Sequence, residues 1–196
     1  LTIVDDDTEL AFSATQFSVK EDGTPVAAVT ITRTGNLSGI VSATITLTNG
    51  TATSTKDYNS TPIQVSFADG ETSKTIEIPI LEDSIVENTE TINLTLTNPT
   101  GGATIGTQKT ATLQIKDNDV KLAFDATEFQ VSEDGTPITE VTINRIGSRE
   151  GIVTATVTPS NSTAEAGKDY DNTPITVTFA DGEIVQTIVI PINNDT

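Results

Sequence analysis

The chain of 196 residues contains no cysteine, no histidine and no tryptophan. Without cysteine it can form no disulfide and perform no thiol chemistry, so its stability has to come from packing or from a bound ion. Without histidine and cysteine, zinc and copper sites are disfavoured, because these residues are the usual ligands of those metals. The sequence also has no apolar stretch of about 18 residues, the length that crosses a membrane.

Aromatic and basic side chains are scarce. Hydrolytic triads need a base such as histidine, and two tyrosines with six phenylalanines do not line the kind of cleft in which a carboxylate pair cleaves sugars. An enzyme is therefore the class of protein least expected. The 10 basic residues stand against 28 acidic ones, and the net charge of −18 repels nucleic acid and anionic membrane surfaces. Cationic partners are favoured instead.

The most regular feature of the sequence is a repeat with a shift of 112 residues and no gap. Residues 10–84 align with residues 122–196, and 44 of the 75 aligned pairs are identical, including EDGTP, KDY and FADGE. The first seven residues, LTIVDDD, align with LQIKDND at residues 113–119. We therefore expect the last strand of a preceding repeat at residues 1–7, a complete repeat at 8–119 and an incomplete repeat at 120–196.

Each repeat is predicted to be an all-β sandwich. Apolar and polar residues alternate with the period of two that is typical of half-buried strands, as in residues 44–48, 65–67, 75–78 and 91–96. Turn-forming pairs such as Asn49-Gly50 and Asp69-Gly70 separate these runs, and we interpret Asp69 and Asp181 as turn residues rather than ligands. No helical spacing is sustained, so about seven strands are expected in each repeat.

Acidic residues are concentrated near the ends of the predicted strands. In the complete repeat they fall in four places: Glu21 with Asp22, Asp57, residues 82–90, and residues 117–119. If these loops meet at one end of the sandwich, their mutual repulsion favours a bound cation, and calcium prefers six to eight oxygen ligands on flexible loops. The other interpretation is that they are ordinary solvated surface acids. The chemistry of the residues leaves both interpretations open.

Four segments of the chain form a specific pattern when taken together: FSVKEDGTPVAAVTITRTG at residues 17–35, ATSTKDY at 52–58, VSFADGETSKTIEIPILEDSIVENTETINLTL at 65–96 and ATLQIKDND at 111–119. This pattern resembles the Calx-β domain, a module of sodium–calcium exchangers, integrin β4 and large bacterial surface proteins. The resemblance covers essentially the whole chain. It implies an immunoglobulin-like sandwich of antiparallel strands, arranged in tandem repeats.

The resemblance also implies a set of calcium ligands. In the complete repeat the matching positions are Glu21, Asp57, Glu82, Asp83, Glu87, Glu90, Asp117, Asn118 and Asp119. In the incomplete repeat they are Glu133, Asp169 and Asp195, with Asn194 in place of the acid before Asp195. Asp5, Asp6 and Asp7 match the last triplet, but the rest of their set is not in the chain. Only the complete repeat is expected to hold a whole site.

The function implied is a calcium-binding interaction or adhesion module of a larger multi-repeat bacterial protein at the cell surface or secreted. In that module the ion stiffens the loops and the joint between repeats. Two alternatives stay open: a passive spacer without metal, and a regulatory calcium sensor attached to a membrane transporter. The expected partners are calcium ions and neighbouring repeats, with other cell-surface proteins, or a second copy docked through the incomplete repeat, as further candidates. No nucleic acid is expected. The extracellular or cell-surface location rests on the resemblance and the composition, not on a signal segment.

Overall fold

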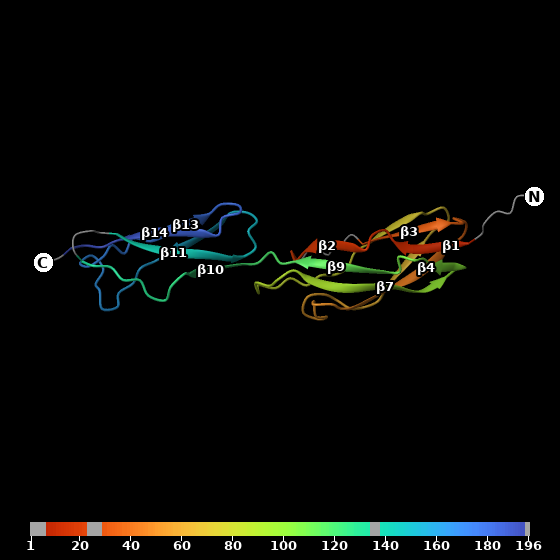
Figure 1. Cartoon of the computed structure of the whole chain (residues 1–196), viewed down its shortest axis with the longest axis horizontal. Coiled ribbons are helices and arrows are strands. Elements are labelled where there is room, and N and C mark those ends of the chain that lie inside the picture. Colours follow the sequence, from red (N-terminus) through yellow and green to blue (C-terminus); the bar gives the residue numbers. More distant parts are fainter. Residues whose placement is uncertain (1–6, 23–28, 134–137, 195–196) are drawn as a thin grey trace, which may run out of the picture. The chain divides into compact units, whose positions relative to one another are not determined.

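The computed structural model describes residues 7–22, 29–133 and 138–194. Within these ranges the backbone forms strands and loops and no helix, so none of them offers a helix that could span a membrane. The chain divides between Asn118 and Asp119 into two compact units, one residue before the boundary expected from the repeat. Figure 1 shows the first unit in red to green and the second in cyan to blue.

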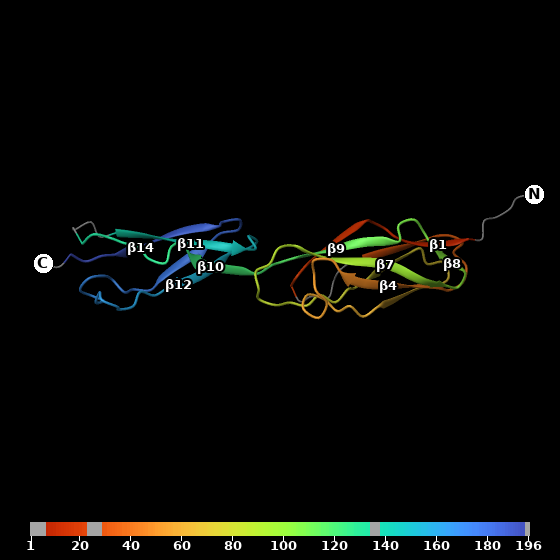
Figure 2. The ribbon, with the colours of Figure 1, turned by 60° about the horizontal axis from the view of Figure 1, so that its bottom comes forward.

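The first unit contains nine strands among its described residues. They are β1 (Thr8–Phe12), β2 (Gln16–Lys20), β3 (Val29–Gly35), β4 (Val41–Asn49), β5 (Ile63–Phe67), β6 (Ser73–Ile76), β7 (Glu90–Thr100), β8 (Ala103–Ile105) and β9 (Thr110–Lys116). One sheet has the order β6-β3-β1-β8 and the other the order β2-β9-β7-β4-β5. The pairs β1–β8 and β2–β9 are parallel, and the other pairs are antiparallel. In Figure 2, β9, β7 and β4 lie side by side.

The two sheets of the first unit enclose one hydrophobic core. In β4, Ile45 and Leu47 are at most 4% exposed, whereas Thr46 between them is half-buried on the outer face. Side chains of both sheets meet in the core, and Phe12 of β1 packs edge to face against Phe17 of β2 with ring centroids 6.3 Å apart. The predicted sandwich, built from alternating side chains, is confirmed.

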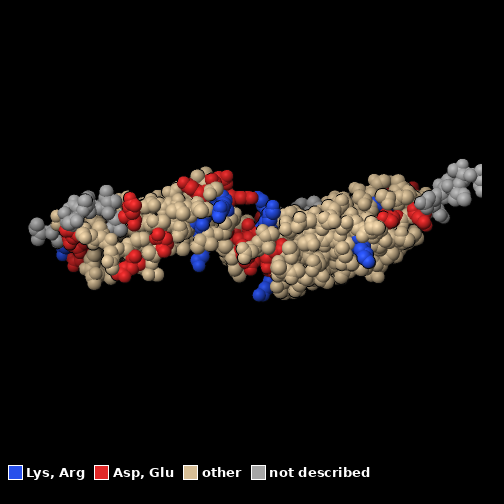
Figure 3. Space-filling model, in the orientation of Figure 1, with Lys and Arg blue, Asp and Glu red and all other residues tan. Residues whose placement is uncertain are grey.

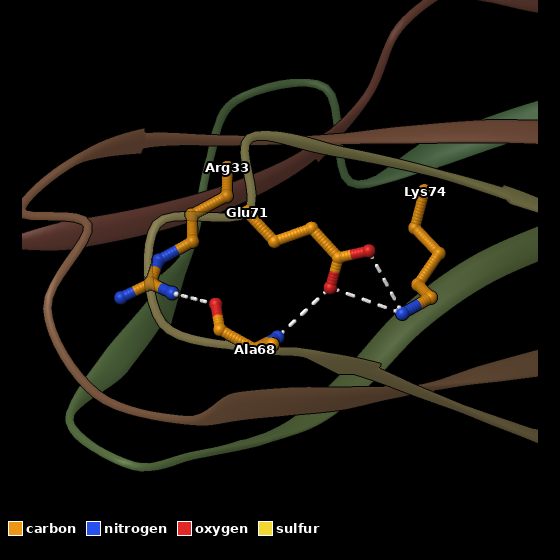
Figure 4. Close-up of polar contacts among 4 residues, drawn as sticks. All are labelled: Arg33, Ala68, Glu71 and Lys74. Atoms are coloured by element: carbon orange, nitrogen blue, oxygen red, sulfur yellow. Dashed lines mark hydrogen bonds and ion pairs between the residues drawn. The ribbon is translucent and has the colours of Figure 1, made fainter.

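A buried arginine holds the turns that follow β3 and β5. Arg33 is 2% exposed, and its Nη atoms donate four hydrogen bonds of 2.7–3.1 Å to backbone oxygens, three in residues 36–39 and one at Ala68. The amide of Ala68 in turn donates to Glu71 Oε2 at 2.8 Å, and Lys74 Nζ donates to the same oxygen at 3.0 Å (Figure 4). These bonds satisfy backbone groups that the turns would otherwise leave unpaired.

The same turn chemistry recurs in the second unit. Asp69 Oδ1 accepts the amide of Gly39 at 2.6 Å, and Asp181 Oδ1 accepts the amide of Gly151 at 2.7 Å. Arg145, 4% exposed, takes the place of Arg33 and donates to backbone oxygens of the equivalent turns. The two aspartates therefore form turns, as predicted.

The strands of the second unit correspond to strands in the first part of the first unit. Its described strands are β10 (Val120–Phe124), β11 (Ile138–Gly147) and β14 (Val185–Pro191) in one sheet, and β12 (Val153–Val157) and β13 (Ile175–Phe179) in the other. Residues 128–132, the counterpart of β2, form no strand. In the first unit β2 pairs only with β9, and the described residues of the second unit include no counterpart of β9.

Candidate metal centre

Three neighbouring strands bring acidic residues to one end of the first unit. In the order β2-β9-β7, Lys20 at the end of β2 lies opposite Lys116 at the end of β9, and Ile115 lies opposite Glu90 at the start of β7. Glu21 and Asp117 directly follow the two parallel strands, so they leave the sheet at the same edge as Glu90. In Figure 3, the acidic side chains of the first unit gather at its ends, while its flank is largely uncharged.

Asp57 reaches this end from the loop after β4. Its Oδ2 accepts the amide of Thr53 at 2.6 Å, and it is 5% exposed. The next residue, Tyr58, is fully buried and donates its hydroxyl to Asn49 Oδ1 at 2.7 Å. Thr55 has the left-handed φ of 73° that closes the loop. The Thr53 amide therefore holds the Asp57 carboxylate, and the bond from Tyr58 to Asn49 holds the loop beside it.

The segment of residues 82–90 is fastened to the loops on both of its sides. The amide of Leu81 donates to the carbonyl of Asp57 at 2.9 Å, and the amide of Glu87 donates to Asp117 Oδ2 at 3.1 Å. Asp83 Oδ1 accepts the amide of Ile85 at 2.7 Å. A hollow of about 400 Å³, lined by Thr51 and residues 87–90, opens beside these acids. The site is therefore reachable from solvent.

Asp57, Glu87 and Glu90 form the tightest acidic group. Each offers one carboxylate oxygen, and these oxygens lie within 4.8 Å of one another. Calcium binds oxygen at about 2.3–2.6 Å, so two ligands on opposite sides of one ion lie about 5 Å apart. A single calcium ion therefore fits among the three carboxylates with little movement.

The acids strongly perturb one another. The pKa of Glu21 is raised to about 7, first by burial and then by the charges of Asp83, Glu87, Asp117 and Glu82. The pKa of Glu90 is also raised to about 7, by burial first and then by its hydrogen bond with Asp57 and the charges around it.

Glu87 shares this environment. Its pKa is raised by burial and by Asp57, Asp83 and Asp117, and Lys56 offsets only part of that effect. Negative charge is thus held at this end without enough nearby positive charge, which is the condition that a bound cation relieves.

Two buried oxygen atoms without hydrogen-bond partners are an independent indication of a ligand-binding site. Glu21 is 3% exposed, and its Oε1 has no hydrogen-bond partner among the described residues; Asn118 Oδ1 is likewise buried without one. A buried acceptor left unpaired costs free energy, and oxygen atoms of this kind are what calcium coordinates. The donor set therefore fits calcium.

Not every predicted ligand joins the central group. Glu82 is exposed, although its charge still raises the pKa of Glu21, and Asp83 is half-buried beside the group. Asp119 is the first residue of the second unit, where its carbonyl accepts the amide of Ser148 at 2.7 Å.

The second unit reproduces only part of the arrangement. Asp169 Oδ2 accepts the amide of Glu165 at 2.7 Å, as Asp57 does with Thr53, and Glu133 is exposed. Both acids line one groove, but no third acid joins them to form a close group among the described residues. Asp195, Asp5 and Asp6 lie outside the described residues.

Asn49 is the structural residue that the sequence interpretation missed. Its side-chain oxygen accepts both the hydroxyl of Tyr58 and the amide of Ser54, and so shapes the loop that carries Asp57. Asn161 does the same for Tyr170 and Ala166. The sequence carries a signal, because this Asn precedes the Tyr by nine residues in both repeats, but the Asn49-Gly50 pair by itself predicts only a turn.

Comparison with protein-family models gives two matches to the Calx-beta domain, over residues 4–119 and 116–196. The chain belongs to the Calx-beta domain family. The predicted resemblance and the immunoglobulin-like sandwich in tandem are thereby confirmed. The two matches overlap at the joint and together cover nearly the whole chain.

Similar Calx-beta sequences occur in large animal proteins. Sodium/calcium exchanger 1 of Rattus norvegicus is 28% identical over 217 residues, which cover 100% of this chain and 22% of the exchanger. Extracellular matrix protein 3 of Lytechinus variegatus is 33% identical over 187 residues, covering 85% of the chain and 6% of that protein. Adhesion G-protein coupled receptor V1 of Danio rerio is 46% identical over 63 residues, covering 32% of the chain and 1% of the receptor. The chain thus spans less than a quarter of the length of these relatives.

Solved Calx-beta structures have the same fold. The calcium binding domain CBD12 of CALX1.1 matches with a TM-score of 0.57 and 24% identity, covering 95% of this chain and 76% of that one. The apo form of the Calx CBD1 domain matches with a TM-score of 0.53 and 25% identity, covering 58% of this chain and 99% of that one. The first match therefore extends over both units of this chain.

Proposed function

We propose that this chain is a calcium-binding module and that its binding site is the acidic end of the first unit. The observation that carries the proposal is the group of Asp57, Glu87 and Glu90, whose oxygens lie within 4.8 Å of one another while the pKa of Glu90 is raised to about 7. These three residues are the core ligands. Glu21, Asp83 and Asp117 surround them and supply further oxygens, with Glu82, Asn118 and Asp119 as outer contributors.

Calcium suits these ligands better than magnesium. The acids stand on loops from four different parts of the chain, and calcium accepts six to eight oxygens in irregular geometry. Magnesium requires a near-octahedral arrangement at about 2.0–2.1 Å and keeps several of its waters. The names of relatives support the same choice, because one solved neighbour is a calcium binding domain and several sequence relatives are sodium/calcium exchangers.

The consequence of binding is mechanical rather than catalytic. An ion among these ligands ties the ends of β2, β7 and β9 to the segment of residues 82–90 and to the Asp57 loop. Asp117 lies one residue before the boundary between the units, so the bound ion also stiffens the joint. In the second unit, Glu133, Asp169 and Asp195 are the counterparts of Glu21, Asp57 and Asp83.

We place this module in a multi-repeat bacterial protein that is secreted or displayed at the cell surface. Similarity to an adhesion receptor and to an extracellular matrix protein supports an adhesive or interaction role. The second candidate is a regulatory calcium sensor attached to a membrane transporter, which the similarity to sodium/calcium exchangers along the whole chain favours.

Isothermal titration of the chain with calcium tests the proposal. We expect a saturable heat of binding, weakened about tenfold or more by Glu90→Gln, because that variant removes a charged ligand from the core group. Glu9→Gln is the matched control, since Glu9 lies in β1 at the other end of the first unit. Absence of heat would favour a passive spacer, and equal loss of affinity in both variants would contradict the proposed location of the site.

A further inference from the structure

Strand β14 lies at an edge of its sheet. Among the described strands it pairs only with β11 (Figure 1). Its counterpart β6 has the same place in the first unit, where it pairs only with β3. The first unit also contains β7, β8 and β9, and none of its described strands covers the free side of β6. The open edge at β14 is therefore a property of the repeat's fold.

The two edge strands differ in charge. Lys74 lies in β6, where its Nζ pairs with Glu71 at 2.9 Å, and Glu77 directly follows the strand. The positions that match Lys74 and Glu77 are Gln186 and Val189. Residues 184–192 contain no charged side chain. Charged side chains on an edge strand, lysine above all, oppose pairing with another chain, so β6 has a protection that β14 lacks.

The surface around β14 is also more apolar than the surface around β6. Four apolar side chains there are 39–47% exposed: Ile146, Ile184, Val185 and Val189. The matching side chains of the first unit are polar and equally open to water: Thr34, Thr72, Ser73 and Glu77. The fold thus exposes these positions in both units, but only the second unit fills them with apolar residues. A cluster of exposed apolar side chains marks an interaction surface.

The free backbone groups of β14 belong to Val185, Thr187 and Val189. The amide of Arg145 in β11 donates to the carbonyl of Ile184 at 2.8 Å, so the backbone groups of Ile184 face β11. Successive residues of an antiparallel strand direct their backbone groups to opposite sides, so those of the three odd-numbered residues face away from β11. No backbone group in the described part of the chain pairs with them there.

We propose that β14 of one copy pairs with β14 of a second copy, antiparallel about a two-fold axis at Thr187. This register places Thr187 opposite Thr187 and Val185 opposite Val189, so that each outward N–H meets an outward C=O. The pairing ends beyond Val189, because the carbonyl of Pro191 accepts the amide of Asp171 at 3.0 Å. The contact uses the same surface on both copies and closes as a dimer.

The chain's own β14 is the partner that this edge fits. A strand added here has to be uncharged and apolar on both of its faces, and β14 itself has these properties. In the same register Ile184, which is 39% exposed, lies opposite the half-buried Ile190 and gains an apolar neighbour. The net charge of −18 opposes association in general, but none of that charge lies in residues 184–192.

A charge-swap pair of variants tests the register. Val185→Glu with Val189→Glu places like charges opposite each other across the two-fold axis, and Val185→Lys with Val189→Lys does the same with positive charge. The two side chains are 47% and 42% exposed within one chain, so these variants should fold. Ser73→Glu is the matched control, because with the native Glu77 it gives the edge of the first unit the same pair of charges.

Sedimentation velocity in chelator, over a range of protein concentrations, measures association independently of calcium. We expect the unaltered chain and Ser73→Glu to form dimers as the concentration rises, and each charged double variant alone to dimerise about tenfold or more weakly. An equimolar mixture of the two double variants should regain dimers, because glutamate then lies opposite lysine. An unaltered chain that is monomeric at every concentration, or a mixture that associates no better than its components, would overturn the proposal.

Amide hydrogen exchange locates the contact on the chain. The amides of Val185, Thr187 and Val189 should exchange more slowly as the protein concentration rises, because pairing protects them. The amide of Thr75, the counterpart of Thr187 in the first unit, should exchange at an unchanged rate. Dimers in which the three amides of β14 gain no protection would contradict pairing through this strand.

Discussion

Phe12 in the first unit and Phe124 in the second occupy equivalent positions, yet Phe12 is 3% exposed and Phe124 is 52% exposed. Both rings make the same edge-to-face contact with a second phenylalanine, at 6.3 and 6.2 Å. What differs is the presence of β7, β8 and β9, which complete the two sheets of the first unit. The same side chain in the same local contact thus becomes core or surface according to strands that lie far away in the sequence.

The acidic residues of the two units also differ according to which strands are present. Asp57 and Asp169 accept equivalent backbone amides at 2.6 and 2.7 Å. Among the described residues, Asp57 meets two glutamates, Glu87 and Glu90, whereas Asp169 joins no such group. In the proposed metal site, the loop after β4 places Asp57, and the later part of the repeat places Glu87 and Glu90. The two units therefore provide matched positions at which the effect of these later strands can be measured.

The largest expected difference between the two units is the loss of stability when the equivalent phenylalanine is truncated to alanine. Phe12→Ala should lower the unfolding free energy of the first unit by about 3–5 kcal/mol, the usual cost of removing a buried phenylalanine. Phe124→Ala should cost about 1 kcal/mol or less, because the ring is half in water already. Calorimetric melting of the whole chain measures both effects. Equal costs would show that the second unit buries this ring in solution.

Calcium should stabilise the two units unequally. At a free concentration of about 100 times its dissociation constant, the ion should add about 2.7 kcal/mol to the first unit, because it binds only the folded state. The melting transition of the second unit should stay in place in dilute solution. Scanning calorimetry with calcium and with chelator checks this, and a uniform shift of both transitions would count against a site confined to the first unit.

Equivalent aspartate-to-asparagine substitutions in the two units show which unit's acids bind calcium. Asp57→Asn keeps an oxygen to accept the amide of Thr53 but removes a charged ligand, so most of the stabilisation by calcium, up to about 2.7 kcal/mol, should be lost. Asp169→Asn should leave that stabilisation unchanged. Thermal shifts at fixed calcium concentration report both variants. If the Asp169 variant lost as much as the Asp57 variant, the second unit would have to be a binding site in its own right.

A pH dependence of the calcium-free chain is also expected. The pKa values of Glu21 and Glu90 are raised to about 7 in the folded state from 4.5. Between about 4.5 and 7 the folded state then holds more protons than the unfolded state, so these two groups make the unfolding free energy fall as pH rises. Glu183 in the second unit has a lowered pKa, held down by the amide of Ala180, and does not contribute to this fall.

Denaturant unfolding in chelator, at several pH values from about 5 to 7.5, measures the slope. Glu21→Gln should flatten it for the first unit. A stability that rises through this window in the unaltered first unit would contradict the electrostatics of the acidic end.

The fold was largely predictable, because alternating residues in short runs dictate strands and the gapless shift dictates two similar units. Two features were not predictable. The pairing of β2 in parallel with β9 depends on contacts between residues nearly 100 positions apart, which no local pattern encodes. The loss of a strand at residues 128–132 followed from a missing partner, although the sequence there still resembles β2.

The family resemblance predicted which acidic residues belong to the candidate site, but not which of them lie close together. Spacing alone could not separate Glu87 and Glu90, which meet Asp57, from the exposed Glu82 in the same run. That distinction depends on how residues 82–90 are fastened to Asp57 and Asp117 through backbone amides. Asn49 was overlooked for the same reason, since its role is visible only from the hydrogen bonds that it accepts.

A calcium titration followed by amide signals in ¹H–¹⁵N spectra of the whole chain, at low protein concentration, tests directly whether calcium binds at the acidic end of the first unit. We expect the amides of Thr53, Ile85 and Glu87, which donate to Asp57, Asp83 and Asp117, to shift and saturate together. The amide of Glu165, which donates to Asp169, should stay in place. Unmoved signals throughout, or a shift of Glu165 at the same calcium concentration as Thr53, would contradict the claim that only the first unit holds a complete site.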